Sequence, residues 1–282
     1  REGQTGPSPS PDQIASLPYG PADPQDGAAA QSLAARPSFA RQLDTVKWEA
    51  GALLAYMTIT QAIVTKDTQS FHFQDEGWFG KDTKALGMDK LTHAFNAYMI
   101  ADFLQHRIEE RTGGPDGTGA ITAALVSSAL QFYSELWDAH KVTSGFSVQD
   151  VAFNSLGAAF SVLRNSVPGL RDKLDFRLLI VPNHEIYTFK GQEHYAQQRY
   201  LFALTLAGFR GLDRSPLRFV ELHAGYYGDN FAARDEAAGR TPKRKLFFGV
   251  GLNLKELFFR SPRSRVGRWV GSGLDYIQIP YT

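Results

Sequence analysis

Apolar residues recur with the spacing of a helix in four stretches of the first 170 residues. Glycine and proline stop two of these stretches, at Gly113-Gly114-Pro115 and at Pro168-Gly169. The links between the stretches are short, which favours antiparallel neighbours, so we predict a four-helix unit. The predicted helices run from Arg41 to Lys66, from Met88 to Arg111, from Thr118 to Val142 and from Ser147 to Val167.

From about residue 175 the pattern changes to alternation from one residue to the next, which is the period of a β-strand. Between Leu246 and Leu254 every second residue is large and apolar, and Gly249 and Gly251 lie between them. We therefore expect another layer, such as the helices, to pack closely on the small-residue face. The predicted strands are Arg177 to Phe189, Gln198 to Arg210, Leu217 to Tyr227, Lys245 to Phe259 and Gly273 to Tyr281.

Together these patterns predict an α+β fold, in which a four-helix unit is followed by a C-terminal antiparallel β-sheet. A partial barrel is the alternative form of the sheet, because the strands are long and rich in aromatic residues. The strands that we predict are fewer than the eight or more of single-chain bacterial barrels, which favours a curved sheet.

Residues 1–38 are rich in Pro, Gly, Ala, Ser and Gln and contain few large apolar side chains. Such a segment buries too little apolar surface to offset the entropy of an ordered chain. We predict a flexible leader there, or an arm that becomes ordered against a partner. A helical domain then spans residues 39–170, and a β-sheet region spans residues 171–282. Because the sequence starts at Arg1 rather than at Met, we expect a processed product.

Composition excludes several classes of function. The net charge of the 282 residues is +1 and the basic residues are dispersed, so we expect no binding to nucleic acid. The absence of cysteine excludes disulfides, thiolate metal sites, a cysteine nucleophile and a lipid-anchored cysteine in this chain. The most apolar segment, Trp48 to Val64, contains Glu49 and is shorter than a typical spanning helix. This favours helices that are exposed to water or lie on a membrane surface.

Pairs of polar residues lie one helical turn apart in three of the predicted helices. Such side chains are costly to bury unless they meet partners, so we expect the three pairs to converge in the fold. Lys90, next to the first pair, is expected to be a solvated or snorkelling side chain rather than a catalytic lysine. The pairs are Asp89 with His93, Glu135 with Asp138, and Asp150 with Asn154.

The spacing leaves three interpretations of these residues open. The first, which we favour, is a buried structural network that includes Lys90 and fixes the register of the helices. The second is a functional site, with His93 as a general base oriented by Asp89 or Asp150, or with a divalent metal held by His93, Glu135 and Asp150. The third is plain exposure to solvent. No cofactor is predicted, except a divalent metal under the second interpretation.

The segments that carry these pairs resemble a known family. FHFQDEGWFG, MDKLTHAF, SELWDAH and GFSVQDVAFNSLGAAF are similar to the YfiM-like predicted periplasmic proteins, a bacterial family of unknown function whose members are often described as lipoproteins. The family pattern is D-K-x-x-H, an acidic residue late in the next helix, and G-[FY]-S-x-x-D-x-x-x-N-x-x-G. A fainter likeness links the same residues to VanZ-like membrane proteins. The matching positions are Asp89, Lys90, His93, Glu135, Gly145, Phe146, Ser147, Asp150, Asn154 and Gly157.

The resemblance covers residues 70–165 well and the C-terminal sheet more loosely. It implies a location in the periplasm or outer membrane of a Gram-negative bacterium, and it implies no established reaction. We therefore expect a non-enzymatic envelope protein, an accessory or scaffold subunit. Its expected partners are other envelope proteins, bound through the N-terminal arm or the strand edges, or a membrane surface. The alternative is a metal- or His-dependent hydrolase or transferase acting on envelope lipid or glycan.

Overall fold

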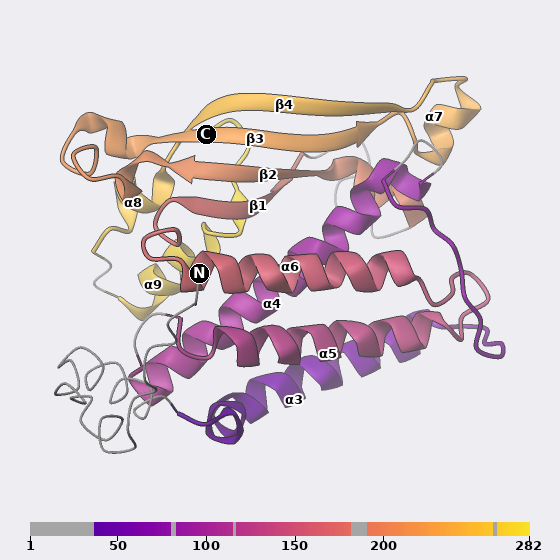
Figure 1. The fold of residues 1–282 in the computed structure, drawn as a ribbon. Coiled ribbons are helices and arrows are strands. Elements are labelled where there is room, and N and C mark those ends of the chain that lie inside the picture. Colours follow the sequence, from indigo (N-terminus) through magenta and orange to yellow (C-terminus); the bar gives the residue numbers. More distant parts are fainter. Residues whose placement is uncertain (1–36, 80–82, 115–116, 182–190, 262–263) are drawn as a thin grey trace, which may run out of the picture. The chain divides into compact units, whose positions relative to one another are not determined.

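The four apolar stretches form long helices that pack beside a β-sheet (Figure 1). The predicted leader lies outside the described residues except for residues 37 and 38, and Phe39–Thr282 is one compact unit. No helix within the described part of the chain combines the length and the apolar character needed to span a membrane. The computed structural model describes residues 37–79, 83–114, 117–181, 191–261 and 264–282. The long helices are α3 (Phe39–Val64), α4 (Met88–Thr112), α5 (Ala120–Asp138) and α6 (Val148–Ser166).

Helix α4 is the centre of the helical layer, because it packs against α3, α5, α6 and the first two strands of the sheet. Its buried Phe95 contacts the rings of Phe176 and Tyr200 from those strands. Helices α4 and α6 approach closely at Gly157 of α6, where a Cβ atom would lie 1.9 Å from the backbone oxygen of Ala94. Only glycine allows the two backbones to touch at this point.

The C-terminal region forms an open sheet with strand order β4-β3-β2-β1-β5, so that β4 and β5 are its edges. Strands β1 to β4 pair antiparallel with their neighbours, as predicted. Strand β5 pairs parallel to β1 through Leu178 and Ile277, so the sheet is mixed rather than wholly antiparallel. The α+β fold class is confirmed with this correction. The strands are β1 (Leu174–Ile180), β2 (Gln198–Thr205), β3 (Val220–Asp229), β4 (Lys243–Leu252) and β5 (Ile277–Gln278).

The last two predicted strands are too long. The fourth ends where a side chain caps α8, and the fifth starts only after α9 and a turn. The Asn253 side chain accepts a hydrogen bond of 2.9 Å from the Glu256 N–H, which ends β4 and starts α8. The Ser264 hydroxyl accepts one of 3.0 Å from the Gly267 N–H and starts α9. Residues 182–189 of the first predicted strand lie outside the described residues. The short elements are α7 (Ala233–Ala237), α8 (Leu254–Phe258), α9 (Arg265–Gly273), and the 3₁₀ turns η1 (Lys84–Gly87), η2 (Gly191–Gln197), η3 (Leu206–Gly208) and η4 (Pro216–Phe219).

The turn η1 leads into α4 with an unusual backbone. Ala85 and Leu86 both have a φ of 55°, in the left-handed region that disfavours residues other than glycine. Both side chains are buried in the aromatic core. The Tyr226 hydroxyl of β3 donates a hydrogen bond of 2.5 Å to the Leu86 carbonyl. The sheet therefore holds the turn from which α4 starts.

The helices cover only part of one face of the sheet. The strand register places Phe248 of β4 on the same face as Phe176 of β1, which contacts α4 and α6. On β4 this face is open, since Leu246, Phe248 and Val250 are 74 %, 81 % and 73 % exposed. The apolar alternation of β4 thus marks an uncovered surface.

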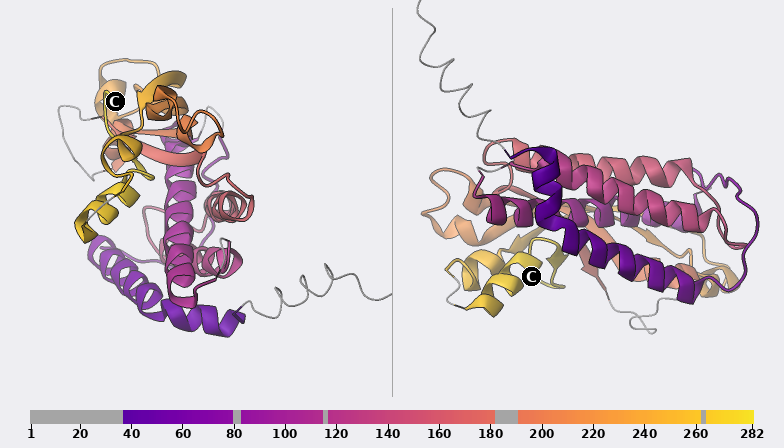
Figure 2. Two further views of the ribbon diagram at one scale, coloured as in Figure 1. Left: turned by 90° about the vertical axis from the view of Figure 1, so that its left-hand side faces the viewer. Right: turned by 90° about the horizontal axis from the view of Figure 1, so that it is seen from below.

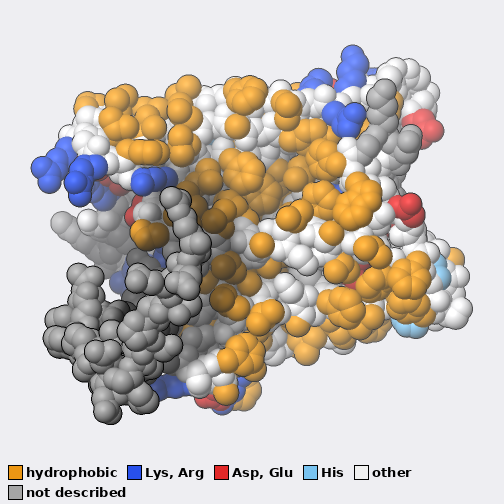
Figure 3. Space-filling model, viewed as in Figure 1, with side chains coloured by type: hydrophobic (Ala, Val, Ile, Leu, Met, Phe, Trp, Pro, Cys, Tyr) orange, Lys and Arg blue, Asp and Glu red, His pale blue; other side chains and the backbone are white. Residues whose placement is uncertain are grey.

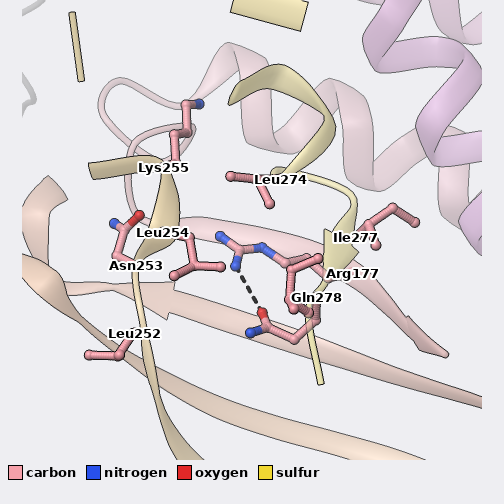
Figure 4. A pocket seen from close by; sticks show the side chains of 9 residues that line it. Arg177, Leu252, Asn253, Leu254, Lys255, Leu274, Ile277 and Gln278 are labelled. Atoms are coloured by element: carbon pink, nitrogen blue, oxygen red, sulfur yellow. Dashed lines mark hydrogen bonds between the residues drawn. The ribbon is translucent and has the colours of Figure 1, made fainter. Parts of the chain in front are cut away.

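The opposite face carries the small residues of β4. The C-terminal segment, rather than the helices that we expected, covers this face at Gly251, whereas Gly249 is exposed. A Cβ atom at Gly251 would lie 2.9 Å from the backbone oxygen of Thr282. Figure 4 shows the Arg177 guanidinium directed at the side chain of Gln278, to which it donates a hydrogen bond of 3.0 Å. The cavity beside them measures about 10 Å³, which is room for about one water molecule.

A chain of buried ion pairs joins the helices to the sheet, and we call it the arginine network. Arg164 of α6 binds Asp102 of α4 at 3.2 Å and Asp175 of β1 at 2.6 Å. Arg177 of β1 binds Asp175 at 2.6 Å and Glu221 of β3 at 2.7 Å. All five residues are buried, so each charge depends on its neighbours in the network.

The contact at Gly157 predicts a sharp difference between two helical glycines. Gly157→Ala places a methyl group against the α4 backbone, and we expect it to lower the free energy of unfolding by about 1–3 kcal/mol or more. Gly51→Ala in α3 is the control, because a Cβ atom there meets no atom of the described residues within 4 Å. Alanine favours the helix, so that change should leave stability equal or up to about 1 kcal/mol higher. Equal melting temperatures of the two variants in calorimetry would contradict the close contact.

Candidate functional site

A buried lysine lies at the centre of the polar residues singled out in the sequence. The Lys90 ammonium on α4 is 2.5 Å from Asp150 Oδ1, 2.8 Å from Glu76 Oε2 and 3.0 Å from Asp89 Oδ2. These three ion pairs match the three donors of an ammonium group. The expectation of a solvated Lys90 is wrong, because carboxylates from the loop before α4 and from α6 compensate its charge inside the protein.

His93 lies one helical turn after Asp89 and faces both neighbouring helices. Its Nε2 is 3.8 Å from Asp89 Oδ1 and 3.7 Å from Asp150 Oδ1. Its Nδ1 is 3.5 Å from Glu135 Oε1 on α5 and 3.3 Å from Asn154 Oδ1 on α6. The imidazole is 20 % exposed, whereas the Glu135 side chain is 1 % exposed. The structure therefore brings residues from three helices together around one imidazole.

We call this group the ion cluster. The Ser147 hydroxyl accepts a hydrogen bond of 3.2 Å from the Asp150 N–H, which fixes the start of α6. The spacing of four residues then places Asn154 on the same side of the helix. Asp138, although three residues from Glu135, lies apart and pairs with Lys141. The members of the ion cluster are Glu76, Asp89, Lys90, His93, Glu135, Asp150 and Asn154.

The sequence reasoning missed one member of the cluster, Glu76, and one residue that binds the cluster, Tyr195. Glu76 belongs to the FHFQDEGWFG segment, whose acidic pair was the available signal. Tyr195, in η2, donates a hydrogen bond of 2.6 Å from its hydroxyl to Asp89 Oδ1. Nothing in the local sequence connects η2 with α4, because the two are 106 residues apart.

Burial and charge act in opposite directions on the acids of the cluster. Burial raises the pKa of Glu135 to about 8, and the attraction of His93 offsets this only in part. Burial also raises the pKa of Glu76 to about 7, against the effect of Lys90. For Asp89, burial is outweighed by His93 and Lys90, and its pKa falls to about 2. Burial opposes protonation of His93, but Asp150, Asp89 and Glu135 raise its pKa overall.

Two polar atoms of the cluster lack hydrogen-bond partners among the described residues. Glu135 Oε1 approaches His93 without a hydrogen bond, and Asn154 Nδ2 has no acceptor. Asn154 also lines a groove of about 280 Å³ between α5 and α6, with Phe132 and Val151 as apolar walls. Asn154 is thus the member of the cluster that also lines this groove.

The arrangement offers two kinds of chemistry. Ligand atoms of Asp89, His93 and Asp150 all lie within 4.8 Å of one another, a nitrogen and two oxygens that suit a divalent metal. The sequence named Glu135 in place of Asp89 for this role. The Lys90 ammonium already pairs with both carboxylates, so a metal would compete with it. The second chemistry is proton transfer by His93, which contacts three acids.

The raised pKa of Glu135 predicts how stability changes with pH. The folded state keeps a proton on Glu135 up to about pH 8, whereas the unfolded chain loses it near pH 4.5. This contribution to stability is therefore full below about pH 4.5 and is lost as the pH rises through about 8. Glu135→Gln stays neutral, so its melting temperature should fall less than that of the native protein between pH 5.5 and pH 8.5.

The control for this experiment is Glu110→Gln, because the Glu110 side chain is 63 % exposed. Its melting temperature should follow that of the native protein at every pH. If Glu135→Gln keeps the full fall of the native protein, the buried proton is not on Glu135.

Part of the helical layer is similar to a known protein family. Residues 75–166 match the model of a family described as "Predicted periplasmic lipoprotein (DUF2279)". This region contains all members of the ion cluster. The likeness to VanZ-like proteins found no support, and no match was found among curated proteins or solved structures. From the Asp75 loop to the end of α6 the protein is thus similar to predicted periplasmic lipoproteins, and this likeness indicates a periplasmic envelope protein.

Proposed function

We propose that the protein is a non-enzymatic accessory or scaffold protein of the Gram-negative cell envelope, in the periplasm or at the inner face of the outer membrane. The observation that carries this proposal is the saturation of the Lys90 ammonium by Glu76, Asp89 and Asp150. A lysine that uses all its donors on buried carboxylates serves to hold segments together. The ion cluster then fixes α4, α5, α6 and the preceding loop as one rigid frame.

A broad apolar surface supports the binding of a partner by this frame. Figure 3 shows hydrophobic side chains spread over α5, α6 and the sheet, with Lys and Arg gathered near the two ends of the sheet. Surfaces of this kind on a folded protein mark sites of protein or membrane interaction. The long side chains that contribute, each more than half exposed, are Ile121, Leu125, Val148, Leu156, Leu163, Leu246, Phe248 and Val250.

Site-specific photo-cross-linking in cells tests the scaffold role. A photoreactive residue at Phe248, on the open face of β4, should give discrete cross-linked products with an envelope component. The same photoreactive residue in place of Glu236, which is exposed in α7, is the control and should give no cross-linked products. Phe248 is 81 % exposed, so its replacement should leave the fold intact. Absence of products at position 248 would count against a partner on this surface.

A second function is favoured by a specific observation. Glu135 Oε1 and Asn154 Nδ2 have no hydrogen-bond partner among the described residues, and Asn154 lines a groove. These features support a metal- or His-dependent hydrolase or transferase acting on envelope lipid or glycan. His93 would then be the base or the metal ligand, with Asp89 and Asp150 orienting it. The apolar walls of the groove suit an acyl chain better than a sugar.

Substitution of Lys90 separates the two functions. Lys90→Met leaves three buried carboxylates without their counter-ion, and we expect the free energy of unfolding to fall by about 3–5 kcal/mol. Lys47→Met is the control, because its ion pair with Asp44 is exposed, and it should change stability by less than about 1 kcal/mol. Denaturant unfolding measures both values.

The same unfolding experiment, repeated with added Zn²⁺ or Mn²⁺, gives the decisive comparison. If the ion cluster is structural, we expect that the metal does not restore the stability of Lys90→Met. Full restoration by metal, abolished by a further His93→Ala substitution, would favour the metal-dependent function instead.

A further inference from the structure

We propose that a groove between α3, α4 and α9 binds an anionic amphiphile, a molecule with an acyl chain and a phosphate or carboxylate head. The groove has a volume of about 780 Å³, within the range of roughly 300–1,000 Å³ for small-molecule sites. Figure 2 shows α9 on one side of α4, with α5 and α6 on the other. The groove uses the C-terminal half of α4, whereas the ion cluster uses its N-terminal turns, so this proposal is independent of the proposed function.

The floor of the groove is apolar. Its aliphatic and aromatic side chains come from two long helices, and Trp269 of α9 closes one side. Tyr276 also lines the groove. Because its hydroxyl donates a hydrogen bond of 2.6 Å to Asp102, its aromatic ring is the part that can contact a ligand. Such a floor favours an alkyl chain over a sugar or a nucleotide. The floor residues from α3 and α4 are Leu53, Met99, Ile100 and Phe103.

The acids that line the groove are already neutralised within the chain. Glu110 pairs with Arg107, which also binds Glu49 at 3.3 Å. Asp275 pairs with Lys255 at 2.7 Å. These carboxylates therefore leave little free negative charge to bind a cationic ligand.

Two arginines of α9 contribute positive charge to the groove. Arg265 and Arg268 of α9 line it, are exposed, and form no ion pair with any described residue. Their spacing of three residues places both guanidinium groups on one side of the helix, and the Ser264 cap fixes where that helix starts. A pair of guanidinium groups suits the planar or tetrahedral oxygens of a carboxylate or phosphate. The combination of an apolar floor with these two exposed arginines at its side selects an anionic amphiphile.

Titration calorimetry with the full chain and dodecyl phosphate, kept below its micelle concentration, tests this site. We expect saturable binding at one molecule per chain. Inorganic phosphate should bind far more weakly, because it lacks an alkyl chain. Dodecyltrimethylammonium should not compete with dodecyl phosphate for the site, because its head group is cationic. Equal binding of the cationic amphiphile would overturn the proposal, and so would the absence of binding to dodecyl phosphate.

Matched variants test the head group and the alkyl chain of the ligand separately. Arg265→Gln combined with Arg268→Gln should weaken dodecyl phosphate binding at least tenfold, as expected for lost charge-assisted hydrogen bonds. Arg210→Gln combined with Arg214→Gln removes the same charge from exposed positions that do not line the groove, and should leave affinity unchanged. Leu53→Gln should weaken binding, whereas Leu54→Gln, one residue along on the exposed side of α3, should not.

The melting temperatures of these variants show whether a loss of binding reflects the groove or the fold. Unchanged melting with lost binding in both test variants supports the site, and equal loss in test and control variants overturns it. Flotation with vesicles of phosphatidylglycerol or phosphatidylcholine then identifies the source of the ligand. Binding that needs Arg265 and Arg268 and occurs only on phosphatidylglycerol supports a bilayer lipid, while binding of dodecyl phosphate alone supports a free amphiphile.

Discussion

The cost of burying charge governs how the segments of this protein come together. A lysine ammonium without counter-ions inside a protein would lose far more hydration than packing could return, so Lys90 requires carboxylates from elsewhere in the chain. Glu76 and Asp150 supply them from segments 14 residues before and 60 residues after it. The arginine network repeats this principle between α6 and the sheet, through Asp102, Asp175 and Glu221. The ion cluster thus joins the helices to one another, and the arginine network joins them to the sheet. Disturbing either one leaves a buried charge without its counter-ion.

The surface shows the opposite arrangement, with large apolar side chains in contact with solvent. On β4 the helix-side face continues past the edge of the helical layer, so its alternating apolar residues have no layer above them. Along α3 only Gln42 and Val46 are buried in a helix of 26 residues that is apolar on several sides. A protein that works alone in water would gain by replacing such residues with polar ones. Their presence supports the proposal that another molecule covers this surface.

Much of the fold and part of the site follow from the sequence alone. The periodic stretches gave the four long helices within about two residues at their starts, and the one-turn spacing of Asp150 and Asn154 was visible locally. What could not be predicted depends on distant partners. Lys90 is buried because of Glu76 and Asp150, and the parallel pairing of β5 depends on a return of the chain across β1. The short helix α8 escaped notice because its cap, Asn253, lies inside a segment with strand-like alternation.

The left-handed turn before α4 links the stability of the sheet to that of the ion cluster. Backbone of this kind at Ala85 and Leu86 costs about 1–3 kcal/mol per residue, and it persists only where the surroundings outweigh that cost. Here the surroundings are the aromatic core and the hydroxyl of Tyr226 on β3. If the sheet loosens, the turn loses its support and relaxes to ordinary dihedral angles, which frays the first turn of α4, where Asp89 and Lys90 lie. In hydrogen exchange, the amides at the start of α4 should therefore open together with those of β3 rather than with the rest of their own helix.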